Sequence, residues 1–168
     1  MSVTLGEARS IAEKLKQNST RVLAVLLFGS VLKTGVGRDA DFVIGTTEEI
    51  AREWWGAWAN SIRVQWPDAF YGQRWIMKRF FPFVYGATVR KKRQQRLLAA
   101  AKLLNIDLSK LTDSAGQQYD IELFLLPENW RLDRVLNLDA MGNVTNLINH
   151  RNTRGFLERI ARESVRLD

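Results

Sequence analysis

The sequence predicts an α/β (α+β) fold in which a small mixed sheet is flanked by helices. Three short apolar runs predict the strands, at residues 22–28, 40–44 and 119–126. Stretches with apolar residues at helical spacing lie before and between these runs. The length of 168 residues is typical of one ordinary domain. We therefore expect a single domain over residues 1–168, with a basic, aromatic insertion at about 66–106.

Local signals place the helices along the chain. A first helix begins with the capping-box pattern Thr4-Leu-Gly-Glu7, and a second begins with Thr46-Thr-Glu-Glu49 and carries Trp54 and Trp58. A basic helix follows at about 88–104, a short one is expected at 130–138 and a last one begins near Asn152. The apolar positions expected on the basic helix are Leu97, Leu98, Ala101 and Leu104, and those on the last helix are Phe156, Leu157, Ile160, Ala161 and Val165. Residues 80–85 favour an edge strand, because Pro82 cannot donate to a central ladder.

Composition limits the kinds of site that the chain can form. It contains no cysteine, which excludes disulfides and thiolate-bound zinc or iron–sulfur centres. A metal would have to be bound by oxygen atoms or by the single histidine, His150. No apolar stretch approaches the length of a membrane span, and the first residues do not form a signal-peptide pattern. We expect a cytoplasmic protein without a membrane partner.

Two acids at the start of the second predicted strand are the first candidate site residues. Asp39 and Asp41 alternate with Ala40, so both point to the same face of the strand, about 6.5 to 7 Å apart. Such a pair can bind one divalent cation together. An Asp-x-Asp at a strand start is also common turn chemistry, so the pair alone does not decide between the two hypotheses.

The residues before these acids make the metal hypothesis more specific. The first strand ends at Gly29-Ser30, a turn follows, and two basic residues, Lys33 and Arg38, lie between this turn and the acids. A strand, a Gly-Ser turn, a basic segment and two acids followed by Phe-Val-Ile resemble the signature of the polymerase-beta-like nucleotidyltransferase superfamily. The resemblance is to its small single-domain members, the minimal nucleotidyltransferases, and is clear only over residues 28–44.

The resemblance implies roles for these residues. Gly29 and Ser30 would hold the triphosphate of a nucleoside triphosphate such as ATP, with Lys33 and Arg38 as further candidate ligands. Asp39 and Asp41 would hold Mg²⁺ or Mn²⁺. The metal would align an acceptor hydroxyl with the α-phosphorus and stabilise the departing pyrophosphate.

A third acid is expected on the strand at 119–126. Asp120 and Glu122 alternate onto one face of that otherwise apolar strand. The family carries a third acid on such a strand, where it helps to hold a second metal and can accept the proton of the acceptor hydroxyl. The acid-then-apolar run ELFLLP favours Glu122, while Asp120 stays the alternative because aspartate is the commoner family residue.

Basic charge is concentrated in one region. The chain carries 25 Lys and Arg against 18 Asp and Glu, and residues 69–106 contain no acid. The cations expected to bind an anionic partner are Arg90, Lys91, Lys92, Arg93 and Arg96. Four of them crowd the predicted start of a helix, where the helix dipole disfavours cations, so an anionic partner such as RNA would relieve the repulsion. The alternative is a hydrated basic surface.

We therefore expect a magnesium-dependent nucleotidyltransferase that moves a nucleoside monophosphate to an unidentified acceptor, with RNA or protein favoured. The segment between Ser30 and Asp39 is shorter than is usual in the family, which keeps a second hypothesis open. In it, the chain is a non-catalytic module that binds a nucleotide or nucleic acid. A third hypothesis is an antitoxin-like nucleotidyltransferase that modifies a partner protein.

Overall fold

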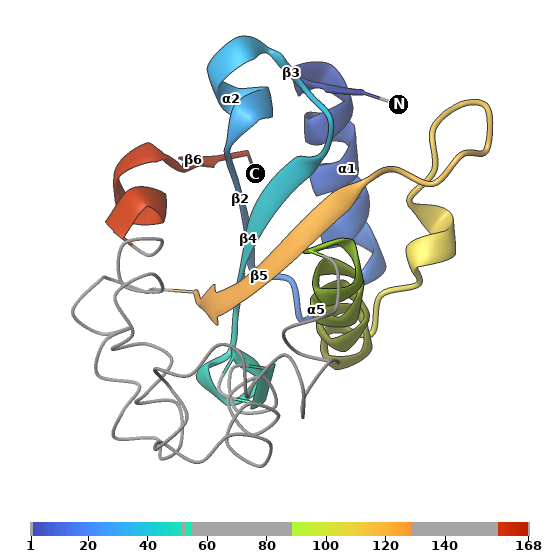
Figure 1. Cartoon of the computed structure of the whole chain (residues 1–168). Helices are drawn as coiled ribbons and strands as arrows, with labels where there is room; N and C mark the ends of the chain where they lie inside the picture. The colour runs from blue at the N-terminus through green and yellow to red at the C-terminus, as the bar shows by residue number, and fades with distance from the viewer. Residues whose placement is uncertain (1, 52, 55–88, 129–157, 168) are drawn as a thin grey trace, which may run out of the picture.

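The computed structural model describes residues 2–51, 53–54, 89–128 and 158–167 (Figure 1). The predicted strand at 80–85, helix at 130–138 and start of the last helix lie outside these residues, as do Trp58 and His150. The elements, in chain order, are β1 (Val3–Thr4), α1 (Leu5–Asn18), β2 (Ala24–Phe28), α2 (Ser30–Thr34), β3 (Val36–Gly37), β4 (Ala40–Thr46), α5 (Val89–Leu104), the 3₁₀ turn η3 (Leu108–Lys110), β5 (Ile121–Pro127) and β6 (Val165–Arg166).

The main sheet is mixed, as predicted. Its strand order is β5-β4-β2-β6, with β4 parallel to β5 and β2 antiparallel to both β4 and β6. A separate two-stranded ribbon joins β1 to β3. The three predicted strand runs are therefore neighbours in one sheet. Of the acids predicted on two of them, Asp41 and Glu122 lie on the adjacent strands β4 and β5, whereas Asp39 and Asp120 each directly precede a strand.

Helix α1 confirms the first capping box. The Thr4 hydroxyl accepts a hydrogen bond from the Glu7 N–H at 3.2 Å, and the Glu7 carboxylate accepts from the Thr4 N–H at 2.8 Å. The helix buries Ala8, Ile11, Ala12 and Leu15 on one face. Figure 1 shows α1 beside α5, and the Ser19 hydroxyl that follows α1 donates to the carbonyl of Leu104 at the end of α5.

The second capping prediction was wrong by one residue. Thr46 is the last residue of β4, and its hydroxyl donates to the carbonyl of Arg21 at 2.8 Å. The hydroxyl that caps the next helix belongs to Thr47, which accepts from the N–H of Ile50 at 3.3 Å, and residues 48–51 and 53–54 are helical. Thr46 cannot cap because the Glu128 N–H also holds its carbonyl in the sheet, at 2.8 Å.

Two predicted apolar faces also differ from the structure. In α5, Ala101 and Leu104 are buried, but Leu98 is 54% exposed. Near the C-terminus, residues 158–163 are helical and bury Ile160, whereas Ala161 is exposed. Val165 does not continue this helix: it lies in β6, paired with Leu27, and the Leu167 N–H donates to the Val25 carbonyl at 2.9 Å. Residues 165–166 adopt an extended conformation because they pair with the edge of β2 that β4 does not occupy.

The core lies between the sheet and its helices. Strands β2, β4 and β5 contribute fully buried side chains that include Leu27, Phe42 and Leu123, and α5 contributes Leu104. Strand β5 begins two residues later than predicted and includes Pro127. Among the described residues, no helix combines the length and the apolar character needed to cross a membrane.

A pair of leucine substitutions tests this assignment of the core. Leu123 is fully buried on β5, so Leu123→Ala should lower the free energy of unfolding by about 2–5 kcal/mol. Leu98→Ala removes the same atoms from an exposed position and should change the free energy of unfolding by no more than about 0.5 kcal/mol. Urea unfolding of both variants measures the difference, and equal losses would contradict the core described above.

Candidate metal and phosphate site

The turn after β2 brings its glycine against one of the predicted metal ligands. Gly29 has φ +85° and ψ −156°, a conformation that only glycine adopts readily. Phe28, the last residue of β2, pairs with Asp41 of β4. A Cβ atom on Gly29 would lie 2.4 Å from Oδ2 of Asp41. Gly29 is therefore required both by the turn and by the carboxylate packed on it.

A short helix and a ribbon span the segment between Ser30 and Asp39. Helix α2 ends after one turn at Gly35, whose φ of +80° reverses the chain and whose N–H donates to the Val31 carbonyl at 2.9 Å. The chain then returns through β3, where a Cβ on Gly37 would meet the hydroxyl of Ser30 at 2.5 Å. Ser30, Gly29 and the acids consequently lie close together despite the short connection.

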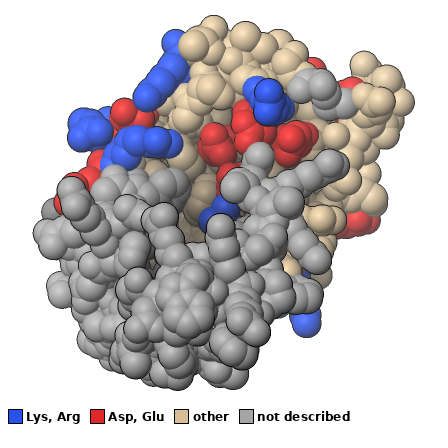
Figure 2. Space-filling view, in the orientation of Figure 1, with Lys and Arg blue, Asp and Glu red and all other residues tan. Residues whose placement is uncertain are grey.

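Asp39, Asp41 and Glu122 form the carboxylate cluster. One oxygen of each residue lies within 4.8 Å of an oxygen of both others. Asp41 and Glu122 are paired residues of the parallel strands β4 and β5, and Asp39 directly precedes the first residue of β4. Figure 2 shows acidic side chains gathered at the centre of the face that it views. Carboxylate oxygens are the ligands that hard cations such as Mg²⁺ prefer.

Asp120, the alternative third acid, does not join this cluster. It is exposed, and its carbonyl accepts a hydrogen bond from the Ala40 N–H at 3.0 Å, where β4 and β5 begin to pair. Asp120 and Arg38 instead line a neighbouring cavity of about 670 Å³. The residues of α5 on its wall include Leu97 and Leu98, which accounts for the exposure of Leu98.

Glu122 has an arginine partner that the sequence did not reveal. It is only 7% exposed, and its Oε1 accepts a charge-assisted hydrogen bond from the guanidinium of Arg96 in α5. The same guanidinium lies 5.5 Å from the centre of the Phe124 ring. A buried carboxylate needs such a partner, because an uncompensated charge in the protein interior is costly. The position of Glu122 within an apolar strand was the one sequence signal that such a cation is needed.

The other predicted basic residues lie on several different elements. Lys33 is exposed on α2 and forms an ion pair with Glu163, Nζ to Oε2, at 3.3 Å. Arg38 is exposed and lies at the cavity beside Asp120. Residues 90–93 begin α5, but their side chains lie outside what the structure describes. An anion-binding role for them, and for Arg96, stays a prediction.

Neither a protein-family model, nor a curated protein, nor a solved structure matches this chain. The chemistry of the site therefore has to be inferred from the side chains themselves. Three carboxylates, one compensating guanidinium and a glycine turn in contact with Asp41 are the features that bear on it.

Two glycine substitutions separate backbone strain from contact with the cluster. Gly29→Ala should displace the Asp41 carboxylate and weaken Mn²⁺ binding by about tenfold or more. Gly35 has a similar positive φ, but nothing lies within 4 Å of the position of its Cβ. Gly35→Ala should therefore cost about 1 kcal/mol of backbone strain and leave Mn²⁺ affinity unchanged. Titration of both variants with Mn²⁺ measures this, and equal affinities would show that the Gly29 contact does not position Asp41.

Proposed function

We propose that this protein is a magnesium-dependent nucleotidyltransferase that moves a nucleoside monophosphate from a nucleoside triphosphate to an acceptor hydroxyl. The observation that carries the proposal is the convergence of Asp39, Asp41 and Glu122 beside the Gly29 turn. Asp41 lies on β4, Asp39 directly precedes that strand, and Glu122 lies on its parallel neighbour β5. The reaction needs no side-chain nucleophile, because positioning and charge neutralisation provide most of the catalysis of phosphoryl transfer.

The donor set fits Mg²⁺ or Mn²⁺. All three candidate ligands are carboxylates, and their oxygens lie close enough to share a cation. When bound, the metal would neutralise charge on the triphosphate and stabilise the departing pyrophosphate. Asp39 and Asp41 are half-buried, so they remain accessible from solvent, whereas Glu122 is buried against Arg96.

The Gly29 turn is the proposed contact for the triphosphate. Gly29 has no side chain, so a phosphate can approach the backbone there without meeting a Cβ. The N–H groups that open a helix have no partner within the helix, and those of α2 follow Gly29 directly. Ser30 adds a hydroxyl at the same position. Phosphates held there would lie beside Asp41, because Asp41 packs on Gly29.

Glu122 has a proposed role on the acceptor side. The acceptor oxygen forms a bond to the α-phosphorus, the bond from that phosphorus to the β-phosphate oxygen breaks, and the hydroxyl proton passes to a carboxylate and then to water. Glu122 is the candidate for this proton transfer, since it belongs to the cluster but lies on β5, apart from the chain segment that carries the two aspartates. Arg38 and Asp120, which line the neighbouring cavity, lie within two residues of Asp39 and Glu122, so the acceptor is proposed to approach from that side.

The acceptor is proposed to be anionic, with RNA favoured over a partner protein. Residues 90–93 bring four basic residues to the start of α5, the helix that also carries Arg96 to the cluster. The phosphate backbone of an RNA would neutralise these positive charges at the start of the helix. Incubation with each labelled triphosphate, magnesium and, in turn, total RNA, cell lysate and the protein itself tests which acceptor is modified.

One observation favours a second candidate, a non-catalytic nucleotide-binding module. Arg96 already compensates the charge of Glu122, so the third carboxylate can have a purely structural role. The protein would then bind a nucleoside triphosphate at Gly29 and Asp41 without transferring its nucleotide. Both candidate functions predict that the protein binds a nucleoside triphosphate. Only the nucleotidyltransferase predicts that it transfers the nucleotide.

Removal of either aspartate tests the enzyme directly. Asp39→Asn and Asp41→Asn should each lower magnesium-dependent transfer by about a hundredfold or more, because each loses a charge that stabilises the transition state. Glu13→Gln removes one negative charge from an exposed position on α1 and should leave transfer unchanged. The measurement is incorporation of labelled nucleotide, with circular dichroism to confirm folding. Wild-type transfer by the double aspartate variant would refute the assignment of the site.

The two acids of the β5 region separate the enzyme from the binding module. Glu122→Gln should reduce single-turnover transfer by about a hundredfold while the triphosphate still binds, because a proton acceptor matters mainly in the transition state. Asp120→Asn, outside the cluster, should have a milder effect. The measurements are single-turnover transfer and nucleotide titration, with urea unfolding to detect instability from the loss of the Arg96 partner. The reverse ranking would assign the role to Asp120, and full transfer by both variants would favour the binding module.

A further inference from the structure

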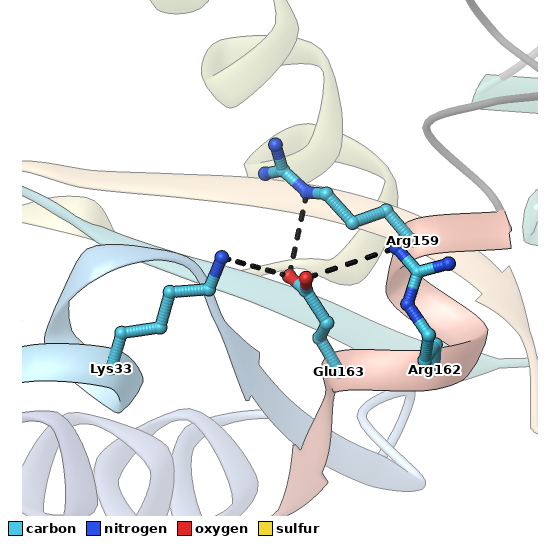
Figure 3. A network of polar contacts seen from close by, with 4 residues as sticks. All are labelled: Lys33, Arg159, Arg162 and Glu163. Carbon is cyan, nitrogen blue, oxygen red and sulfur yellow. Dashed lines mark ion pairs between the residues drawn. The ribbon is translucent and has the colours of Figure 1, made fainter.

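Three cations from α2 and from the C-terminal helical residues surround one carboxylate (Figure 3). Glu163 lies in the helical residues 158–163, and its Oε2 is 3.3 Å from Nζ of Lys33 in α2. Nε of Arg159 is 3.7 Å from the same oxygen, and a terminal nitrogen of Arg162 is 3.9 Å from Oε1. We call Lys33, Arg159 and Arg162 the cation cluster. It joins two parts of the chain that are distant in sequence.

The charges in this group do not balance. Three positive side chains share one negative one, which leaves a surplus of positive charge. The contacts are also longer than ordinary charge-assisted hydrogen bonds, which measure about 2.7–2.9 Å. Oε2 of Glu163 is buried and accepts no hydrogen bond from any residue in the described part of the chain. Glu163 is thus a poor match for its cations, and they keep the capacity to bind another anion.

The cation cluster lies next to the proposed triphosphate contact. Lys33 is in the single turn of α2 that begins at Ser30, and its N–H donates to the Gly29 carbonyl at 3.3 Å. The Arg159 guanidinium lies 6.0 Å from the centre of the Phe28 ring, and Phe28 directly precedes Gly29. The side chains of Lys33, Arg159 and Arg162 are 56%, 47% and 72% exposed, so each can turn toward a ligand.

We propose that the cation cluster binds the outer phosphates of a polyphosphate and that Glu163 is an internal anion which the phosphates displace. A phosphate carries more charge and more acceptor oxygens than a carboxylate, so it can satisfy all three cations together. The inference deepens the proposed function, because it rests on a triphosphate at Gly29. It predicts that affinity rises with the number of phosphates, and that Glu163 limits affinity instead of supporting it.

Calorimetric titration with inorganic tripolyphosphate, without metal and at fixed low salt, tests the proposal. Lys33→Gln and Arg159→Gln should each weaken binding by about threefold or more, and Glu163→Gln should tighten it by a similar factor. Glu158→Gln is the control for Glu163, since it removes the same charge from the same helix. Lys102→Gln, exposed on α5, is the control for the cations. Neither control should change the affinity beyond the small effect of net charge.

Two results would overturn the proposal. Glu163→Gln could bind tripolyphosphate no more tightly than Glu158→Gln does, or Lys33→Gln could bind it as well as Lys102→Gln does. Lys33→Gln decides the question even if Glu163→Gln does not fold, because Lys33 is more than half exposed. The titration uses no metal and no transfer, so its result does not depend on the carboxylates that the transfer assay tests. Failure of the transfer assay and failure of the cation cluster are therefore distinguishable.

Discussion

The parallel pairing of β4 with β5 is the constraint on which the site depends. Its register sets Asp41 opposite Glu122 and Ala40 opposite Ile121. A slip of one residue would turn the side chains of β5 to the opposite face, so Glu122 would enter the core and an apolar residue would face Asp41. Every residue of β5 is buried, so the register is held by the packing of side chains such as Leu123 and Leu125 on one face and by the Arg96 partner of Glu122 on the other. The apolar core therefore determines which acids meet.

Electrostatics sets the second requirement, because three carboxylates held this close repel one another. Arg96 offsets part of that repulsion at the most buried member, Glu122. Its guanidinium is held over the Phe124 ring, and its carbonyl accepts a hydrogen bond from the Trp54 indole at 3.3 Å. Helix α5 is thus tied to the sheet at the site itself. Arg96 therefore both packs α5 against the sheet and offsets the negative charge of the cluster.

Features encoded by nearby residues could be predicted from the sequence, and features that depend on distant contacts could not. The Thr4–Glu7 capping box, the strand of Asp41 and the closeness of Asp39 to Asp41, two residues apart, are all local. The partner of Glu122 is not local, because its cation comes from a helix that the charge pattern assigned to an anionic ligand. Val165 was misplaced in a helix for the same reason, since its conformation is set by pairing with Leu27. The roles proposed for the site residues in nucleotidyl transfer come from the sequence resemblance. Neither the residue pattern nor the geometry of the site assigns them.

The same parallel pairing has a consequence for how the chain folds. Strands β2 and β4 are antiparallel neighbours close in sequence, so they can associate soon after collapse. Strand β5 joins β4 only after a long loop has closed, and contacts between distant segments form slowly. Until then, Asp39 and Asp41 lie on an open strand edge without Glu122 or Arg96. We therefore expect the completed site to be acquired late, during the step that also covers the exposed edge of β4.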